Sequence, residues 1–384
     1  MMTRRKYIDR RMLAAMATLI GTAIGAGIFG LPYIASQAGF LPVFALIVVL
    51  GIMMLYSNLM YGEIILRTEK ECGIVGYAEK YLGERGKKAA AFITFFSLYS
   101  GTLAYIILGG VFLDSFLSGY FGGDVFFYAT ATFIFAAAVT LFDLSILSAI
   151  ESWMVLALLL VMIGGVAKSL PYVDMQNLMT YDPHKLFLPF GAVLFSLGAF
   201  PAVPEMKRIM EKDCQRLKDV ICGGTVVYVA FYVIFVAVVL GVTGERTTEE
   251  SFVGLSRVIG DGVIAMGFLF AMLAIMTSYL VSSMGIKNIL RYDYKMEDHK
   301  AWFLALFLPY ALYFFGFRNF LEVISVAGGI SGGLFGIMII LIFYVAKDKG
   351  DRKPAYELRI LEEISAFMIF IYLMGILYQF TYGY

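Results

Sequence analysis

The sequence predicts an all-α protein that crosses a membrane many times. Of its 384 residues, 60% are hydrophobic and 15% are charged, whereas an ordinary soluble domain has about 25% charged residues. The charged residues lie between apolar runs of about 18 residues or more, a length that can cross the hydrocarbon core of a bilayer as a helix. Long apolar runs separated by short charged segments are typical of a polytopic membrane protein.

Eleven apolar runs are long enough to be membrane spans, at residues 12–39, 41–66, 88–118, 125–142, 146–168, 185–209, 218–241, 261–288, 301–317, 319–346 and 360–382. If the N-terminus is cytoplasmic, 25 of the 30 Lys and Arg residues lie on the cytoplasmic side, as the positive-inside rule requires. The sequence therefore predicts a multi-pass protein of the cytoplasmic membrane with an extracytoplasmic C-terminus. Outside the spans, residues 71–88 form either a short helix on the inner membrane surface or a solvated loop, and residues 249–259 form a short helix over the outer mouth.

The first and sixth runs contain matching interruptions. In the first, "GTAIGAGIFG" at residues 21–30 has four glycines, although each glycine inside a helix costs about 1 kcal/mol relative to alanine. In the sixth, the Ser-Leu-Gly triplet at residues 196–198 is followed by Pro201 and Pro204. Broken helices at corresponding positions of two five-helix halves predict an inverted-repeat transporter with its binding site at the breaks. The predicted repeats comprise residues 12–168 and 185–346, and residues 360–382 form an extra helix.

A helix break inside a membrane exposes backbone groups that hydrocarbon cannot satisfy. The N–H groups near Ala26 and Gly27 suit a carboxylate, and the carbonyl groups of residues 21, 23 and 24 suit an ammonium group or a sodium ion. We expect Gly27→Val to abolish transport without reducing expression, because the new side chain enters the site. Small residues at four-residue spacing are also typical of close helix packing, and for Gly21 and Gly30 this explanation is equally good.

The interrupted runs carry a family resemblance. "GTAIGAGIFGLPYIASQAGF" resembles the first helix of the amino-acid/polyamine/organocation superfamily, and "LFSLGAFPAVPEMKRIM" resembles the sixth helix of its amino acid/auxin permease and aromatic amino acid permease branches. The resemblance extends along the chain in helix order and is specific in these two helices. It implies the leucine-transporter fold, with a 5+5 inverted repeat plus one extra helix.

The resemblance also implies a substrate site made largely of backbone groups. The amides of Ala26 and Gly27 would bind the substrate carboxylate, and the carbonyl groups of Ala23 and of the turn at 195–197 would bind the ammonium group. Tyr105 in the third span either closes this site or packs as one aromatic residue among many. The complete implied substrate-binding set is Thr22, Ala23, Gly25, Ala26, Gly27, Tyr105, Phe195, Ser196, Leu197 and Gly198.

A sodium ion is the one cofactor that the resemblance suggests. In sodium-coupled members of this fold, a Thr-Ser pair in the eighth helix meets carbonyl groups of the first helix. The residues that match this candidate sodium site are Gly21, Ile24, Ala274, Thr277 and Ser278. The alternative is that both hydroxyl groups bond back to the preceding helical turn. Some relatives have an asparagine at the position of Ile28, so a second sodium site is not expected, and residues 152–167 lack the lysine of some proton-coupled relatives.

The sequence therefore favours a secondary active transporter that moves a neutral, apolar or aromatic, amino acid by alternating access. Coupling to a sodium or a proton gradient is expected. The alternative is a non-transporting nutrient receptor on the same fold, as in spore germination. The motif H-E-x-x-H is absent from the sequence, and its two histidines, His184 and His299, lie in loops outside the predicted spans, so we do not expect an enzyme. The expected partners are the amino-acid substrate and membrane lipid, without nucleic acid or an obligate protein partner.

Overall fold

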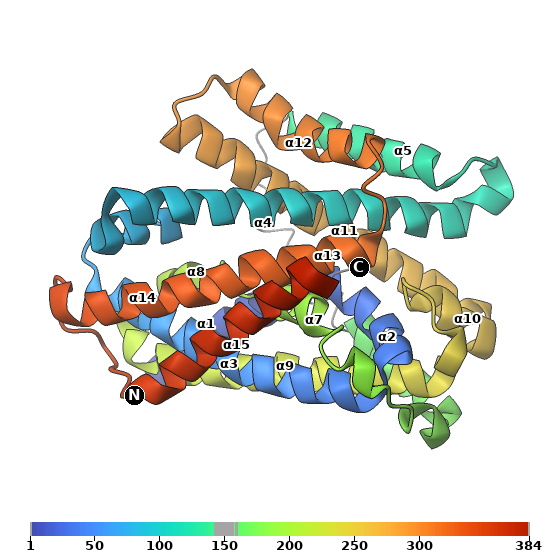
Figure 1. Ribbon diagram of the computed structural model, residues 1–384, viewed down its shortest axis with the longest axis horizontal. Helices are drawn as coiled ribbons and strands as arrows, with labels where there is room; N and C mark the ends of the chain where they lie inside the picture. The colour runs from blue at the N-terminus through green and yellow to red at the C-terminus, as the bar shows by residue number, and fades with distance from the viewer. Residues whose placement is uncertain (1, 142–156, 158–159, 383–384) are drawn as a thin grey trace.

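The helical architecture expected from the sequence is observed. A computed structural model describes residues 2–141, 157 and 160–382 (Figure 1). Within these residues every regular secondary-structure element is a helix, and one isolated β-bridge joins Gly39 and Tyr181. The α-helices of the first half are α1 (Met2–Ala23), α2 (Gly27–Ala38), α3 (Phe40–Arg67), α4 (Ile74–Phe121) and α5 (Val125–Thr140).

The second half begins after an apolar helix at Leu160–Tyr172, and most of the predicted fifth span at 146–168 lies outside the described residues. Its α-helices are α7 (Phe190–Ser196), α8 (Ala202–Met210), α9 (Leu217–Thr243), α10 (Phe252–Ile259), α11 (Asp261–Asn288), α12 (Asp298–Phe314), α13 (Phe320–Val326), α14 (Gly333–Lys349) and α15 (Glu362–Tyr382). Short 3-10 or π-helical turns are η1 (Leu170–Tyr172), η2 (Met175–Leu178), η3 (Pro183–Lys185), η4 (Glu211–Arg216), η5 (Gly244–Arg246), η6 (Ile289–Asp293) and η7 (Ala327–Gly332).

Fewer helices are long and apolar enough to cross a membrane than the eleven runs predict. In the described part of the chain six helices meet both conditions, or seven when α1 and α2 count as one bent span. The predicted sixth span at 185–209 falls short because its break leaves α7 with 7 residues and α8 with 9. A polytopic membrane protein is therefore confirmed, whereas the eleven-helix count and the inverted repeat stay predictions.

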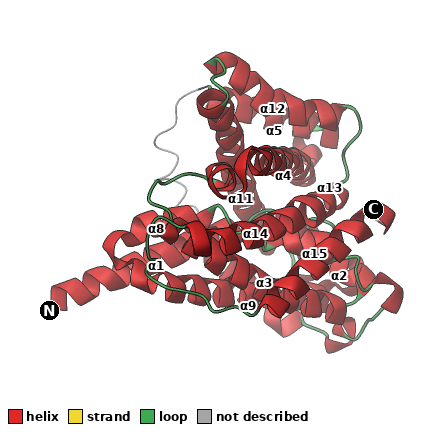
Figure 2. Cartoon of the chain, turned by 60° about the vertical axis from the view of Figure 1, so that its left-hand side comes forward, coloured by secondary structure: helices red, strands yellow, loops and turns green. Residues whose placement is uncertain are grey.

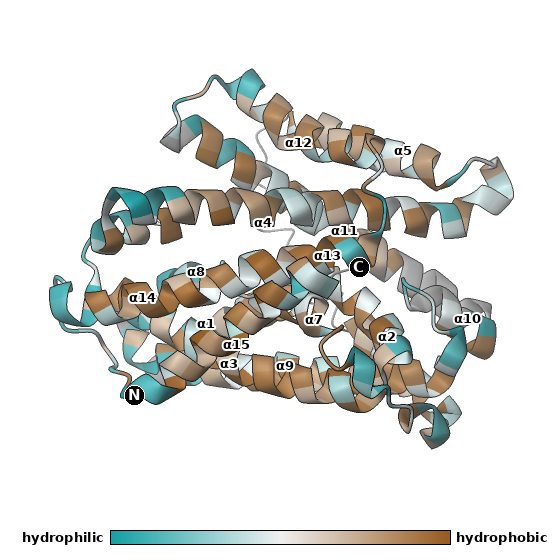
Figure 3. Cartoon of the chain, viewed as in Figure 1, coloured by the Kyte–Doolittle hydropathy of each residue, from teal (hydrophilic) through white to brown (hydrophobic). Residues whose placement is uncertain are grey.

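The helices form two packed groups. Helices α4, α5, α11 and α12 contact one another, and they lie together at the top of both views (Figures 1 and 2). In the second group, α9 packs against α1, α2 and α3, while α14 contacts both α3 and α4. Apolar residues cover the middle of the helices, and hydrophilic residues gather at the helix ends and connections (Figure 3). This distribution is the one expected of helices that lie in a bilayer.

Both predicted short helices are present. Residues 74–82 form the start of α4, which changes direction at Gly83, where φ is 76°. Glycine is required there because this left-handed conformation is costly for residues with a side chain. The second short helix is α10, and Ser251 just before it donates a hydrogen bond to the carbonyl of Phe29 in α2.

Ion pairs hold the end of the molecule that is predicted to be cytoplasmic. The carboxylate of Glu63 is completely buried, with Oε1 2.8 Å from Nε of Arg67 and Oε2 2.6 Å from the N–H of Leu358. Glu71 pairs with Lys207 of α8, and this hydrogen bond holds the pKa of the Glu71 carboxyl below its ordinary value. The segment between α14 and α15 is thus tied to α3, and α8 is tied to the α3–α4 connection.

Candidate substrate site at two helix breaks

The first helix break lies between α1 and α2. The axis bends by 53° between Ala23 and Gly27. Inside the break the N–H of Gly25 donates to the carbonyl of Ala23 at 3.0 Å, and Thr22 is exposed. Among the described residues, no backbone carbonyl accepts a hydrogen bond from the N–H of Ala26 or Gly27. The start of α2 therefore has donors to offer, as helix N-termini generally do.

The second break lies between α7 and α8. Helix α7 ends at Ser196, and residues 197–201 leave the helical path before α8 starts at Ala202. The N–H of Gly198 donates to the carbonyl of Phe195 at 3.2 Å, which tightens the end of α7. Pro201 precedes α8, where the missing N–H of proline removes no helical hydrogen bond. Proline and glycine thus account for the position of this break.

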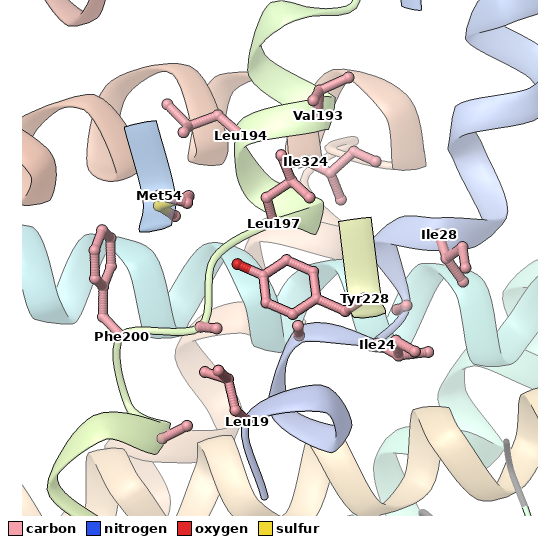
Figure 4. Packing of buried hydrophobic residues seen from close by; sticks show 14 of the residues in the cluster. Leu19, Ile24, Ile28, Met54, Val193, Leu194, Leu197, Phe200, Tyr228 and Ile324 are labelled. Atoms are coloured by element: carbon pink, nitrogen blue, oxygen red, sulfur yellow. The ribbon is translucent and has the colours of Figure 1, made fainter. Parts of the chain in front are cut away.

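The two breaks are in direct contact. A Cβ atom on Gly27 would lie 2.4 Å from Oγ and 2.9 Å from Cα of Ser196. Helix α1 packs against α8 and α2 packs against α7, so each half of one broken helix contacts a half of the other. Leu197 and Phe200 of the second break belong to the same buried apolar cluster as Ile24 of the first (Figure 4). A side chain at Gly27 would therefore collide with Ser196 of α7, and the expected effect of Gly27→Val on transport stays a prediction.

Gly25 differs from its neighbour. A Cβ atom built on Gly25 would have no heavy atom within 4 Å. By contrast, a Cβ on Gly30 would lie 2.6 Å from Cδ2 of Leu321 in α13, so Gly30 packs against another helix. The open space at the first break is therefore next to Gly25, beside the N–H groups of Ala26 and Gly27.

Tyr232 of α9 joins the two breaks and was missed by the sequence reasoning. Its hydroxyl oxygen lies 2.8 Å from the carbonyl oxygen of Ala23 and 2.9 Å from that of Ser196. These two carbonyls are the last of α1 and α7, so two helix C-termini face one point. Each helix C-terminus carries about half a negative charge. No local pattern distinguishes Tyr232, because it is one of 25 tyrosines and its role depends on residues far away in the chain.

The remaining predicted substrate residues lie at the breaks or close to them. Ser196 donates its hydroxyl proton to the carbonyl of Ala192 at 2.7 Å, within its own helix. Tyr105 on α4 is partly buried, and its side chain lies near those of Ser278 and Ser282 on α11. Ala23, Ala26 and Leu197 are buried, and Phe195 and Gly198 are partly exposed.

Among the candidate sodium ligands, Thr277 has side-chain hydrogen bonds that the structure shows. The hydroxyl of Thr277 donates back to the carbonyls of Leu273 at 2.8 Å and Ala274 at 3.1 Å. Helix α11 packs mainly against α4, α10 and α12, and in the described part of the chain no hydrogen bond joins it to α1. The geometry thus matches the alternative in which Thr277 satisfies its own helix.

The arrangement at the breaks suits a zwitterion. Free N–H groups at the start of α2 favour a carboxylate. The carbonyl ends of α1 and α7 favour a positively charged group. The N–H groups and the carbonyl ends lie beside the open space at Gly25. Neither the carboxylate nor the positively charged group of a ligand needs an ionised side chain as its partner there.

Comparison with known proteins identifies the family. The model of the tryptophan/tyrosine permease family matches residues 9–380. The chain is 25% identical over 346 residues to the tyrosine-specific transport system 2 of Haemophilus influenzae, covering 84% of each chain. It is 24% identical over 373 residues to a tryptophan-specific transport protein of Pseudomonas aeruginosa, covering 90% of this chain and 88% of that protein.

A third relative has a different named substrate. The chain is 22% identical over 291 residues to glutamine transporter 2 of Aliivibrio fischeri, which covers 72% of this chain and 74% of that protein. All three relatives are named as transporters, and none as an enzyme or a receptor. Because the family model matches nearly the whole sequence, the chain belongs to the tryptophan/tyrosine permease family of membrane transporters, as the resemblance in its first and sixth helices predicted.

Proposed function

We propose that this protein is a secondary active transporter of a neutral amino acid, with aromatic amino acids as the first candidates, across the cytoplasmic membrane. The observation that carries the proposal is the contact between the two helix breaks, where Gly27 abuts Ser196 and one hydroxyl reaches the carbonyls of both. Family membership and the named substrates of the relatives support the same substrate class.

In the proposed bound state the amino-acid head group lies in the open space beside Gly25. Its carboxylate accepts hydrogen bonds from the N–H groups of Ala26 and Gly27, and its ammonium group faces the carbonyls of Ala23 and Ser196. Tyr105 contributes to the boundary of the side-chain space from α4. A site that binds the head group through backbone atoms is compatible with relatives that are named for substrates with chemically different side chains, tyrosine and glutamine.

Alternating access is proposed to use the two halves of the broken helices. Helices α1 and α8 form one contacting pair, and α2 and α7 form another. If the pairs move apart in turn, each exposes the head-group position to one side of the membrane. This motion needs no change inside any half-helix, because the breaks absorb the change in backbone angles.

The test is uptake of labelled amino acids by proteoliposomes that contain the purified protein. We expect accumulation or exchange of at least one neutral amino acid, with tyrosine, tryptophan and glutamine tested first. Protein-free liposomes are the control. Absence of uptake and of exchange for all twenty amino acids would contradict the transporter function and would reopen the receptor alternative, which the family and the named relatives do not support.

The coupling ion is tested in the same vesicles. Uptake is measured with an imposed sodium gradient, with an imposed proton gradient and with neither. The sodium site proposed from the sequence comprises Gly21, Ile24, Ala274, Thr277 and Ser278. It predicts uptake that depends on sodium and a loss of that dependence in Thr277→Val. Sodium-independent uptake would reject this site, in agreement with the hydrogen bonds that Thr277 makes within α11.

A further inference from the structure

One buried hydroxyl serves two carbonyl groups at the junction of the helix breaks. Tyr232 is fully buried, and its hydroxyl oxygen lies 2.8 Å from O of Ala23 and 2.9 Å from O of Ser196. A phenol carries one proton. The hydroxyl therefore donates to only one of the two carbonyls at any moment.

When the hydroxyl donates to Ala23, the carbonyl of Ser196 is left without a backbone donor among the described residues. The carbonyl of Ala23, by contrast, also accepts a hydrogen bond from the N–H of Gly25 at 3.0 Å. An unsatisfied carbonyl in a buried site is costly. Both carbonyls are also helix C-termini, so the point that they face favours a positive charge.

We propose that Tyr232 is a positioning residue for the amino group of the substrate, an inference that rests on the transport function proposed above. The hydroxyl fixes the last carbonyls of α1 and α7 around one point. The ammonium group donates to the carbonyl that the hydroxyl proton leaves, while the hydroxyl satisfies the other. The amino group is common to all amino acids, so the contribution of Tyr232 to affinity is the same whatever the substrate side chain.

Tyr228 supplies a matched control. It lies one helical turn before Tyr232 on α9 and is also fully buried. Figure 4 shows its ring beside Leu197 of the second break. In the described part of the chain its hydroxyl has no hydrogen-bond partner. Tyr232→Phe and Tyr228→Phe each remove one oxygen atom from a buried ring, but only the first removes an oxygen that holds the two breaks.

The experiment compares the wild type, Tyr232→Phe and Tyr228→Phe in proteoliposomes, using each labelled amino acid that the wild type takes up. KM and the maximum rate are measured separately, and the amount of folded protein is determined from thermal unfolding of the same preparation. We expect Tyr232→Phe to raise KM about tenfold, which corresponds to about 1.4 kcal/mol of binding free energy. The factor should be similar for every transported amino acid, and Tyr228→Phe should leave KM unchanged.

Three results for Tyr232→Phe would overturn the inference while leaving the transport function intact. An unchanged KM with less folded protein would show that the hydroxyl only stabilises the fold, and a lower KM would show that it competes with the amino group. A KM increase limited to substrates with one kind of side chain would also contradict it. If the wild type takes up no amino acid, the proposed function itself fails, and the inference fails with it.

Discussion

Alanine substitutions at Gly25 and Gly27 should separate substrate binding from the packing of the two breaks. The two glycines are two residues apart in one break, yet their surroundings differ. A Cβ on Gly25 would meet nothing within 4 Å, whereas a Cβ on Gly27 would lie 2.4 Å from Oγ of Ser196. Neither glycine has a positive φ, so alanine can adopt both backbone conformations.

The expected effects on stability have opposite signs. Gly25→Ala should raise the free energy of unfolding by about 0.4–1 kcal/mol, because alanine restricts the unfolded chain more than glycine does. Gly27→Ala should lower it. Forcing a methyl group into a filled space costs about 1–3 kcal/mol, and the helix propensity of alanine offsets about 1 kcal/mol of that cost. The new methyl would also lie 2.9 Å from Cα of Ser196, which cannot move without shifting α7.

The expected effect on transport is large for Gly25→Ala despite its intact fold. The new methyl group occupies the open space in which the amino-acid head group is proposed to lie. Overpacking a protein core costs about 1–3 kcal/mol. The same cost for a ligand that shares the space with the new methyl group corresponds to a KM increase of about 5- to 150-fold. Gly27→Ala should instead reduce the amount of folded protein.

The assay measures thermal unfolding in detergent and uptake by proteoliposomes for both variants and the wild type. Wild-type KM in Gly25→Ala would refute the assignment of the open space to the substrate. Wild-type stability in Gly27→Ala would refute the close contact between the breaks. Either result would be decisive, because the two readouts are independent.

Three further predictions concern groups outside the substrate space. Asn58→Leu should stabilise the protein by about 1–3 kcal/mol in thermal unfolding, because Asn58 is completely buried and, among the described residues, neither of its amide atoms has a partner; destabilisation would show that the amide has a partner after all. Glu63→Gln should lower stability by about 3 kcal/mol, since it removes the buried charge that pairs with Arg67, and an unchanged unfolding temperature would contradict this. The pKa of Glu71 is lowered by Lys207, so its contribution is present above the ordinary pKa of 4.5 and is lost as the pH falls through the lower folded-state value; the stability difference between the wild type and Glu71→Gln should therefore be constant near neutral pH and vanish on acidification, and a difference that grows in acid would refute the assignment.

The two broken helices were predictable because their signals are local. Four glycines in residues 21–30 and two prolines after residue 198 are visible without any knowledge of the fold. Their mutual contact was predicted from the repeat, and the proximity of Gly27 to Ser196 agrees with it. The same arguments could not distinguish Gly25 from Gly27. The difference depends on where a Cβ on each glycine would point when α2 packs against α7.

Residues that act across the fold were not predictable. Tyr232 lies in an apolar helical run, as many other tyrosines of this chain do. Its role arises only when α9 packs against both breaks. Thr277 shows the opposite case, since its hydroxyl lies at the position expected for a sodium ligand but forms hydrogen bonds within its own helix. Hydropathy predicts eleven spans, whereas six or seven helices in the described part of the chain are long and apolar enough to cross a membrane. One reason is that the break between α7 and α8 leaves each of these helices shorter than a membrane span.

Substrate protection of a cysteine placed at Thr22 tests the central claim most directly, namely that the two helix breaks form the amino-acid site. Thr22 is exposed in the last turn of α1, three residues before Gly25, where a Cβ would meet no other group within 4 Å. The background replaces the three native cysteines, Cys72, Cys214 and Cys222, by serine. The alkylation rate of Thr22→Cys by a small thiol reagent is then measured with and without a transported amino acid. The account predicts slower alkylation, with half-maximal protection at the substrate concentration that gives half-maximal binding. An alkylation rate that does not respond to a saturating concentration of that amino acid would contradict it.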